Sequence, residues 1–242
     1  MSLTTFTIYG ERCTGTNFVR KLIFDNFYVE HVYIPDRVHG WKHFFGHDKN
    51  VEAIRNSTNC IIFCIVRNPI DYLVSFFNNP HHQAKERKKD FITFISSEFY
   101  SAVEEFEEHS AMDIYFEKNR NYKNIFEMRS VKNKFLFLTV PKLTRNSYFM
   151  HYEDLKLYPL QFIEEVESRF EIKRKSNVYL VEKKRINPQN EEWNRFSLSE
   201  ERLKENYVIE DPQAKKIIRE RLDFEAETLI GYNKEDILRR LE

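Results

Sequence analysis

The chain has 242 residues, of which 41% are hydrophobic and 31% charged, and its formal net charge at pH 7 is zero. This length allows one large domain or two small ones, and the lack of an internal repeat or flexible linker favours a single domain, residues 1–242. The balanced charge does not favour a general nucleic-acid binder. No apolar run approaches the roughly 20 residues of a membrane-spanning helix.

The cysteines and the N-terminal residues bear on the cellular compartment in which the chain is expected to work. Cys13, Cys60 and Cys64 are an odd number without the spacing of a metal site. The N-terminus lacks the basic and apolar stretches of a secretory signal. Both observations favour a reducing, cytoplasmic setting.

The first predicted element joins a strand to a helix through a glycine loop. An alternating, β-rich run over residues 3–9 predicts the strand, and an apolar pattern over about 16–27 predicts the helix. The loop between them runs from Gly10 to Gly15. Such a loop is suited to bind an anion, because backbone N–H groups converge there and the helix dipole adds positive charge. An ordinary strand-turn-helix corner is the alternative interpretation.

The loop resembles a nucleotide-binding loop only in part. Gly10 and Gly15 have the spacing G-x-x-x-x-G of a Walker A loop, but the next residues are Thr16 and Asn17 instead of Lys and Ser or Thr. The lysine for the β- and γ-phosphates and the hydroxyl for magnesium are therefore missing. This difference argues against an ordinary nucleotide triphosphatase.

Strands and helices are expected to alternate in the first third of the chain. Expected are a strand over 28–34, a helix over 51–56, a strand over 60–66 and a helix from Pro69. The run over 60–66 (CIIFCIV) is apolar throughout, which is typical of a parallel strand covered on both faces. The order predicts an α/β fold with a central, mostly parallel sheet flanked by helices.

The remaining two thirds predict mainly helices. Residues 78–90 are polar and charged, which predicts a solvated loop. Helices are expected over about 91–106, 124–139, 159–170, 198–207, 212–229 and 234–241, and strands over 147–152 and 177–181.

A second candidate anion site lies where the strand over 60–66 ends. Arg67 stands at this end, where ligands of open α/β sheets bind, and its rigid guanidinium suits phosphate. Ser75 offers a hydroxyl if the helix start folds back, and Asp71 is expected to orient Arg67 or to satisfy N–H groups. The alternative is a structural Arg67–Asp71 pair, with Ser75 on the helix surface.

Together the two elements resemble the sulfotransferases that use 3′-phosphoadenosine-5′-phosphosulfate (PAPS). Residues 67–75 (RNPIDYLVS) match every fixed position of the family motif R-N-P-x-D-x-x-x-S, which binds the 3′-phosphate. Residues 12–17 (RCTGTN) are similar to the P-K/R-S-G-T-T loop, which binds the 5′-phosphosulfate. Residues 151–155 (HYEDL) resemble a third element, R-Y-E-D-L. The resemblance covers roughly residues 3–160 and implies a P-loop-like sulfotransferase architecture.

The chain departs from the family pattern at several positions. Cys13 stands where a basic residue usually precedes S-G-T, and Arg12 lies one place earlier. Either Arg12 takes over this role or the cation comes from elsewhere. His151 replaces the Arg of the third element and is interpreted as structural. Lys42 and His43 are the nearest counterpart of a family pattern K-T-H, with different spacing.

The resemblance implies in-line transfer of a sulfuryl group from PAPS to an acceptor hydroxyl. Positioning and charge stabilisation do most of the work in such a reaction. Arg12 and Lys42 would neutralise the transferring or leaving group, and His43 would deprotonate the acceptor. No metal is expected, because sulfate esters carry less charge than phosphates. The residues implied to bind the donor are Cys13, Thr14, Gly15, Thr16, Asn17, Arg67 and Ser75.

Several alternatives stay open at this point. His43 as an ordinary packed histidine is one, with His39 as the reserve base. The acceptor is expected to be a carbohydrate or other small molecule, covered by a mainly helical segment over about 78–130. Rival functions are a P-loop kinase, which requires magnesium-ATP, and a sulfotransferase-like domain that binds its ligand without chemistry. The sequence does not predict the oligomeric state.

Overall fold

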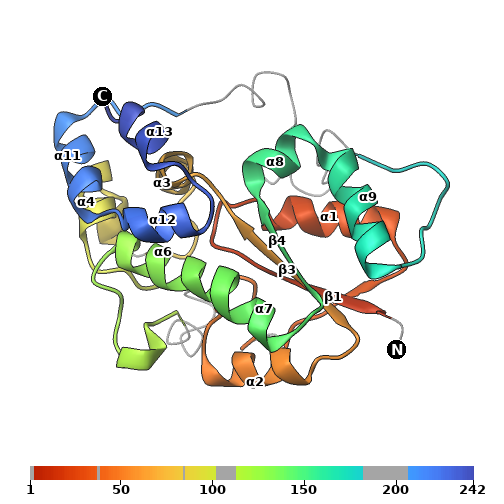
Figure 1. Ribbon diagram of the computed structural model, residues 1–242. Coiled ribbons are helices and arrows are strands. Elements are labelled where there is room, and N and C mark those ends of the chain that lie inside the picture. The colour runs from red at the N-terminus through yellow and green to blue at the C-terminus, as the bar shows by residue number, and fades with distance from the viewer. Residues whose placement is uncertain (1–2, 37–38, 84, 102–112, 182–206) are drawn as a thin grey trace.

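The computed structural model describes residues 3–36, 39–83, 85–101, 113–181 and 207–242, which fold around a parallel β-sheet (Figure 1). Its four strands lie in the order β2-β1-β3-β4, and every neighbouring pair is parallel. The strands are β1 (Thr5–Tyr9), β2 (Glu30–His31), β3 (Cys60–Val66) and β4 (Ser147–His151). The predicted α/β class and the parallel sheet are thereby confirmed.

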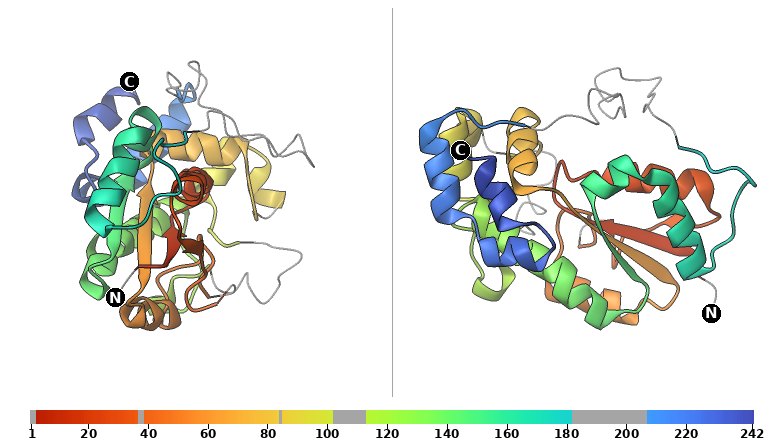
Figure 2. Two further views of the ribbon diagram at one scale, coloured as in Figure 1. Left: turned by 90° about the vertical axis from the view of Figure 1, so that its right-hand side faces the viewer. Right: turned by 45° about the horizontal axis from the view of Figure 1, so that its top comes forward.

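Strand β3 is buried along its whole length, because helices cover both faces of the sheet (Figure 2). Ile61, Phe63 and Ile65 belong to the core on one face, while Ile62 and Cys64 belong to the core on the other. The first face is covered by α1 (Thr16–Asn26), α8 (Tyr152–Leu157) and α9 (Pro159–Phe170). The second is covered by α2 (Asp48–Asn56), the π-helical turn η3 (Phe135–Thr139) and α7 (Val140–Leu143). Burial on both sides explains why the strand sequence is apolar throughout.

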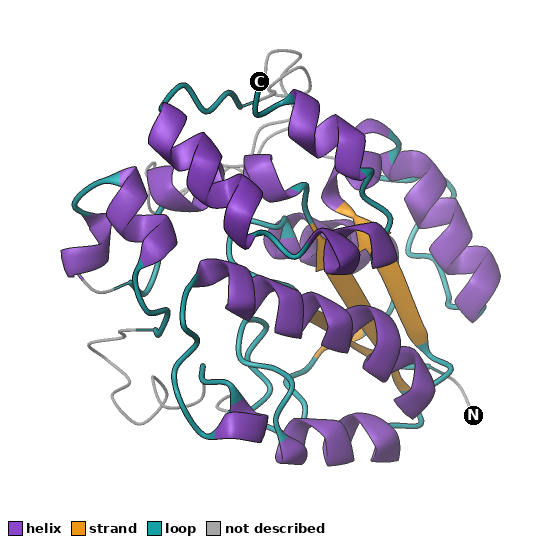
Figure 3. Cartoon of the chain, turned by 60° about the vertical axis from the view of Figure 1, so that its left-hand side comes forward, coloured by secondary structure: helices purple, strands orange, loops and turns teal. Residues whose placement is uncertain are grey.

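A further group of helices lies beyond the end of the sheet toward which β3 runs (Figures 1 and 3). It consists of α3 (Pro69–Asn78), α4 (Phe91–Ser96), α6 (Ile125–Lys134), α11 (Pro212–Arg221), α12 (Phe224–Leu229) and α13 (Lys234–Arg239). Helix α3 shares a core with α11 and α13, through residues such as Leu73, Ile218 and Ile237. The last part of the chain is therefore packed against the segment that follows β3.

Where the observed helices differ from the predicted ones, side chains from distant segments provide the reason. The helix expected over 212–229 is interrupted at Leu222, because Asp223 begins α12 as its N-cap and binds Ser130 and Lys134 of α6. The helix expected over 91–106 ends at Ser96, and Phe99 pairs with Tyr122 through backbone hydrogen bonds instead.

Other predicted elements are shortened or lie elsewhere. The strand expected over 28–34 is reduced to β2, because Tyr28 donates its backbone N–H to Lys173 outside the sheet. Residues 177–181 form no strand, and the Asn26 amide holds the backbone of Leu180 there. The segment 78–90 contains a 3₁₀ turn, η1 (Lys85–Lys88), and a second one, η2 (Phe116–Lys118), precedes α6. The helix expected over 198–207 lies almost wholly outside the described residues.

No helix within the described ranges is both long enough and apolar enough to cross a bilayer.

A buried ion pair joins α6 to α12 beside the end of β3. The guanidinium of Arg129 donates to both carboxylate oxygens of Glu227, at 2.6 and 2.8 Å, and to the carbonyl of Arg67 at 2.7 Å. Both side chains are only 2% exposed. Because a buried charge is costly without its partner, this pair fixes the C-terminal helices relative to Arg67.

We expect Arg129→Met to lower the free energy of unfolding by about 3–5 kcal/mol, because it leaves the Glu227 carboxylate buried without a cation. Urea unfolding followed by circular dichroism measures this loss. Lys216→Met is the matched control, since the Lys216–Glu220 pair is exposed and we expect a change below about 0.5 kcal/mol. Equal losses in the two variants would contradict the assigned role of the pair.

Candidate functional site

Three loops begin at the same edge of the sheet. Tyr9 of β1 pairs with Cys64, and Val66 of β3 pairs with His151 of β4, so the carboxyl ends of these strands are aligned. The segments that follow the three strands are therefore neighbours, and in open α/β folds this edge is where ligands bind. They are the segments that resemble the three family motifs.

The first of these loops requires glycine at both of its ends. A Cβ on Gly10 would lie 2.6 Å from the Ile65 side chain, and one on Gly15 would lie 2.4 Å from the Tyr152 ring. Gly15 also has a φ of 94°, in the left-handed region, and caps α1. The loop is closed by Thr14, whose hydroxyl donates to the Glu11 carbonyl at 2.6 Å. Helix α1 begins at Thr16, so the positive end of its dipole faces the space beyond the loop.

Arg67 links the three loops. Its guanidinium donates to the Cys13 carbonyl at 2.8 Å, and its central carbon lies 4.7 Å from the centre of the Tyr152 ring. The ring of Tyr207 lies on the guanidinium as well, at 5.8 Å. The Nε of Arg67 is buried and has no hydrogen-bond partner among the described residues. A buried donor in this state is suited to receive an anion.

Asp71 does not pair with Arg67, contrary to one of the two interpretations of the sequence. Its carboxylate accepts hydrogen bonds from Arg240 at 2.5 and 3.1 Å, and Arg240 also binds the side chain of Asn68. Arg67 therefore contacts the Cys13 carbonyl and the Tyr152 ring instead of Asp71. Ser75 is buried in α3. The C-terminal end of this helix lies against the first loop, where the Cys13 thiol is 3.8 Å from the Asn79 carbonyl.

Arg12 is enclosed beneath the first loop. Its guanidinium lies 3.1 Å from Asp113 and 3.3 Å from Glu11, contacts the Ser101 hydroxyl, and has no exposed side-chain surface. Lys132 of α6 completes the group, with Nζ 2.6 Å from Glu11 and in contact with Asp113. We call Glu11, Arg12, Asp113 and Lys132 the buried charge cluster. Burial opposes the charge on Asp113, but the two cations outweigh it and lower the pKa of this carboxyl.

Lys42 and His43, by contrast, lie directly against the loop. The Lys42 ammonium donates to the Asn17 side chain at 2.6 Å, at the start of α1. The His43 ring, at Nδ1, lies 2.6 Å from the Gly10 carbonyl, which accepts when this nitrogen carries the proton. Burial, then the positive charges of Lys42 and Arg12, lower the pKa of His43 well below 6.5. The ring is therefore neutral at pH 7, with Nε2 as an acceptor.

The structure thus brings together most of the residues that the sequence singled out, and adds others. His39, the reserve base, is held by Asp36 at 2.8 Å instead of by the loop. His151 is held by the Ile230 carbonyl. The sequence analysis did not assign a role to Tyr152 or Lys132. Tyr152 lies in the segment 151–155 that resembles the third family element, so it could have been singled out, whereas no local pattern marks Lys132.

Compared with protein-family models, curated proteins and solved structures, the chain matches none of them.

We expect Gly15→Ala to distort the loop, because alanine would have to adopt a φ of 94° and to displace the Tyr152 ring. The backbone cost alone is about 1–3 kcal/mol of unfolding free energy. Gly46→Ala is the control, since Gly46 has a φ of 97° but an added Cβ would meet nothing nearer than 3.7 Å. In thermal unfolding, Gly15→Ala should lose clearly more stability than Gly46→Ala. Similar losses of stability in the two variants would show that the close approach of the Tyr152 ring does not require glycine at position 15.

We also expect the stability to fall in mild acid. His43 has a lower pKa folded than unfolded, so the unfolded chain binds its proton first as the pH drops below about 6.5. Each such histidine lowers the unfolding free energy by up to about 1.4 kcal/mol per pH unit. His43→Gln should therefore show a shallower decline than the unmodified chain in urea unfolding between pH 7.5 and 5.5. Parallel declines would mean that His43 titrates normally.

Proposed function

We propose that this chain is a PAPS-dependent sulfotransferase, which moves a sulfuryl group from PAPS to an acceptor hydroxyl of a carbohydrate or other small molecule. The observation that carries the proposal is the position of Arg67, which binds the Cys13 carbonyl at 2.8 Å and lies on the Tyr152 ring at 4.7 Å. Three segments that resemble separate motifs of one family thus meet at one guanidinium. The parallel register makes these segments neighbours, and Arg67 is the side chain that contacts both of the others.

The residues at this edge fit the two anionic groups of PAPS. Arg67, with its buried Nε lacking a partner, would bind the 3′-phosphate, together with Ser75. The amides of the loop and of the first turn of α1 would bind the 5′-phosphosulfate, because helix N-termini attract anions. PAPS supplies the sulfuryl group, and the chain positions and stabilises it.

Lys42 and His43 are placed to act on the transferred group. We assign the neutralising role to Lys42, which lies at Asn17, in preference to Arg12, which is enclosed in the buried charge cluster. The neutral His43 would take the proton of the acceptor at Nε2, while Nδ1 holds the Gly10 carbonyl. Nearby negative charge on the bound donor would raise the His43 pKa again and so strengthen it as a base.

The burial of Arg12 favours a second candidate function, a sulfotransferase-like domain that binds the donor product without catalysing transfer. Such a domain needs the Arg67 site but no free cation at the loop. A magnesium-dependent kinase remains the less favoured rival, because Thr16 and Asn17 replace its catalytic residues. None of the three cysteines forms a disulfide, and we propose a cytoplasmic setting for the chain.

Calorimetric titration with adenosine 3′,5′-bisphosphate (PAP) tests the donor site. We expect PAP to bind more tightly than ATP with magnesium, and Arg67→Ala to weaken PAP binding about tenfold or more, because a charge-assisted hydrogen bond is lost. Lys216→Ala, an exposed change on α11, is the control and should bind like the unmodified chain. Preference for magnesium-ATP would overturn the proposal. Tight PAP binding without transfer from PAPS to any acceptor would favour the second candidate function, a domain that binds the donor product without catalysing transfer.

A further inference from the structure

Two segments that are far apart in the chain form one exposed surface at the C-terminal end of α1. The first is the end of that helix with the residues after it, 24–28, and the second follows α9, residues 173–180 (Figures 1 and 2). The buried Asn26 joins them, because its side-chain amide donates to the Leu180 carbonyl at 2.8 Å and accepts from the Leu180 N–H at 2.7 Å. The Asn26 carbonyl also accepts the backbone N–H of Lys175 at 2.8 Å.

Four large apolar side chains of these segments face the solvent. They are between 51% and 68% exposed, and with two lysines they make up what we call the basic aromatic patch: Phe24, Tyr28, Val178, Leu180, Lys173 and Lys175. Tyr179, which stands between Val178 and Leu180, packs against the core instead. Proteins rarely group exposed apolar side chains in this way unless the group contacts a partner.

The two lysines stand among the aromatic rings. The Lys175 ammonium lies 4.3 Å from the centre of the Phe24 ring, and the Lys173 ammonium lies 5.4 Å from the centre of the Tyr28 ring. Phe24 and Tyr28 nevertheless keep more than half of their surface exposed. Lys175 also donates to the Phe24 carbonyl at 2.5 Å, and its remaining N–H groups can bind a second acceptor.

The charge of the basic aromatic patch is positive. Asp25, the acidic residue within the two segments, pairs with the lysine four positions earlier at 2.8 Å. Arg174 pairs with Glu167 of α9 at 2.7 Å. Lys173 and Lys175 form no ion pair with any residue that the structure describes. Their charges therefore favour a partner with an anionic surface.

Apolar side chains beside lysines are typical of a surface that binds to anionic lipids. Aromatic and aliphatic groups enter the boundary between headgroups and acyl chains, while the ammonium groups stay at the level of the lipid phosphates. A protein partner needs a complementary surface of about 800 Å², whereas a bilayer accommodates projecting side chains of any outline. We propose that the basic aromatic patch docks this chain reversibly on a membrane that contains anionic lipids.

The position of the basic aromatic patch leaves the candidate donor site open. Helix α1 begins at the first loop and ends at the patch, and its 11 residues span about 16 Å. A membrane bound at one end of this helix would therefore not cover the other end. Docking is independent of the proposed sulfotransferase function, because it uses neither Arg67 nor the first loop.

Cosedimentation of the purified chain with vesicles tests the proposal. Vesicles of phosphatidylcholine alone are compared with vesicles that also contain phosphatidylserine. We expect the chain to sediment with the anionic vesicles at low salt and to bind phosphatidylcholine alone much more weakly. Added sodium chloride should reduce the binding, because salt screens the attraction between the lysines and the lipids.

One matched pair of variants tests the apolar contribution. Leu180→Ser removes a side chain that is 51% exposed in the patch, and Leu160→Ser removes one that is equally exposed in the first turn of α9. We expect Leu180→Ser to weaken binding to anionic vesicles about fivefold or more, because a leucine that enters the bilayer boundary leaves water. Leu160→Ser should bind like the unmodified chain.

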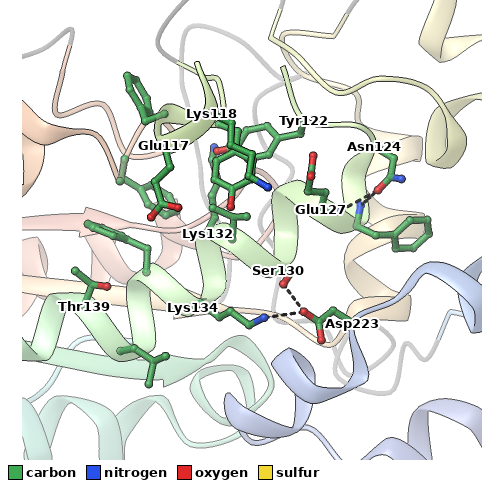
Figure 4. A pocket seen from close by; sticks show the side chains of 18 of the residues that line it. Glu117, Lys118, Tyr122, Asn124, Glu127, Ser130, Lys132, Lys134, Thr139 and Asp223 are labelled. Atoms are coloured by element: carbon green, nitrogen blue, oxygen red, sulfur yellow. Dashed lines mark hydrogen bonds and ion pairs between the residues drawn. The ribbon is translucent and has the colours of Figure 1, made fainter. Parts of the chain in front are cut away.

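A second matched pair tests the charge. Lys173→Gln combined with Lys175→Gln should weaken the binding about tenfold or more, since each lysine near an anionic surface contributes about fivefold. The control combines Lys118→Gln with Lys216→Gln, which removes the same charge elsewhere. Lys118 lies over an aromatic ring as Lys175 does, 5.1 Å from the centre of Tyr115, beside a separate cavity (Figure 4). All variants should keep the circular dichroism spectrum of the unmodified chain.

Three results would contradict membrane docking. One is no binding to the anionic vesicles at low salt. Another is binding that does not distinguish neutral from anionic vesicles, or that the patch variants and their controls weaken alike. The third is a dimer in analytical ultracentrifugation without lipid that Leu180→Ser dissociates, which would assign the patch to a second copy of the chain.

Discussion

The arrangement of the molecule depends on four charges buried together beneath the first loop. Glu11 and Arg12 come from that loop, Lys132 comes from α6, and Asp113 joins them from a third segment. Because burying one charge without its partners is costly, these segments are held in a single relative position. The first loop and helix α6 are therefore held together by these charges. Arg12, which family resemblance places in catalysis, is in this structure part of the support.

The parallel register of the sheet provides the second constraint. It aligns the ends of β1, β3 and β4, so that Arg67 meets the first loop at Cys13 and the third segment at Tyr152. No single segment forms the candidate anion site by itself. Glycine at position 15 is required by the approach of Tyr152, and that approach exists only because the strands are in this register.

The sequence predicted what is encoded locally. The apolar run of β3 and the helix starts at Pro69 and Pro159 follow from neighbouring residues, and the structure confirms them. Partners far apart in the chain left no such signal. Arg12 and Asp113 are 101 positions apart, so the enclosure of Arg12 was not predictable. The break before α12 was missed for the same reason, because the partners of Asp223 lie on α6. Charge type alone does not reveal whether a residue faces a ligand or another residue.

The clamp by Arg240 has a consequence for the order in which the molecule is assembled. Arg240 binds Asp71, which stands 169 positions earlier in the chain, and through Asn68 it reaches the start of α3. Loop closure over such a separation is slow compared with local pairing. On the ribosome, β1, β3 and β4 can emerge and pair while the clamp residue has not yet been synthesised. The sheet can thus form before Arg240 fastens Asp71 and Asn68, so the segment that follows β3 reaches its final position last.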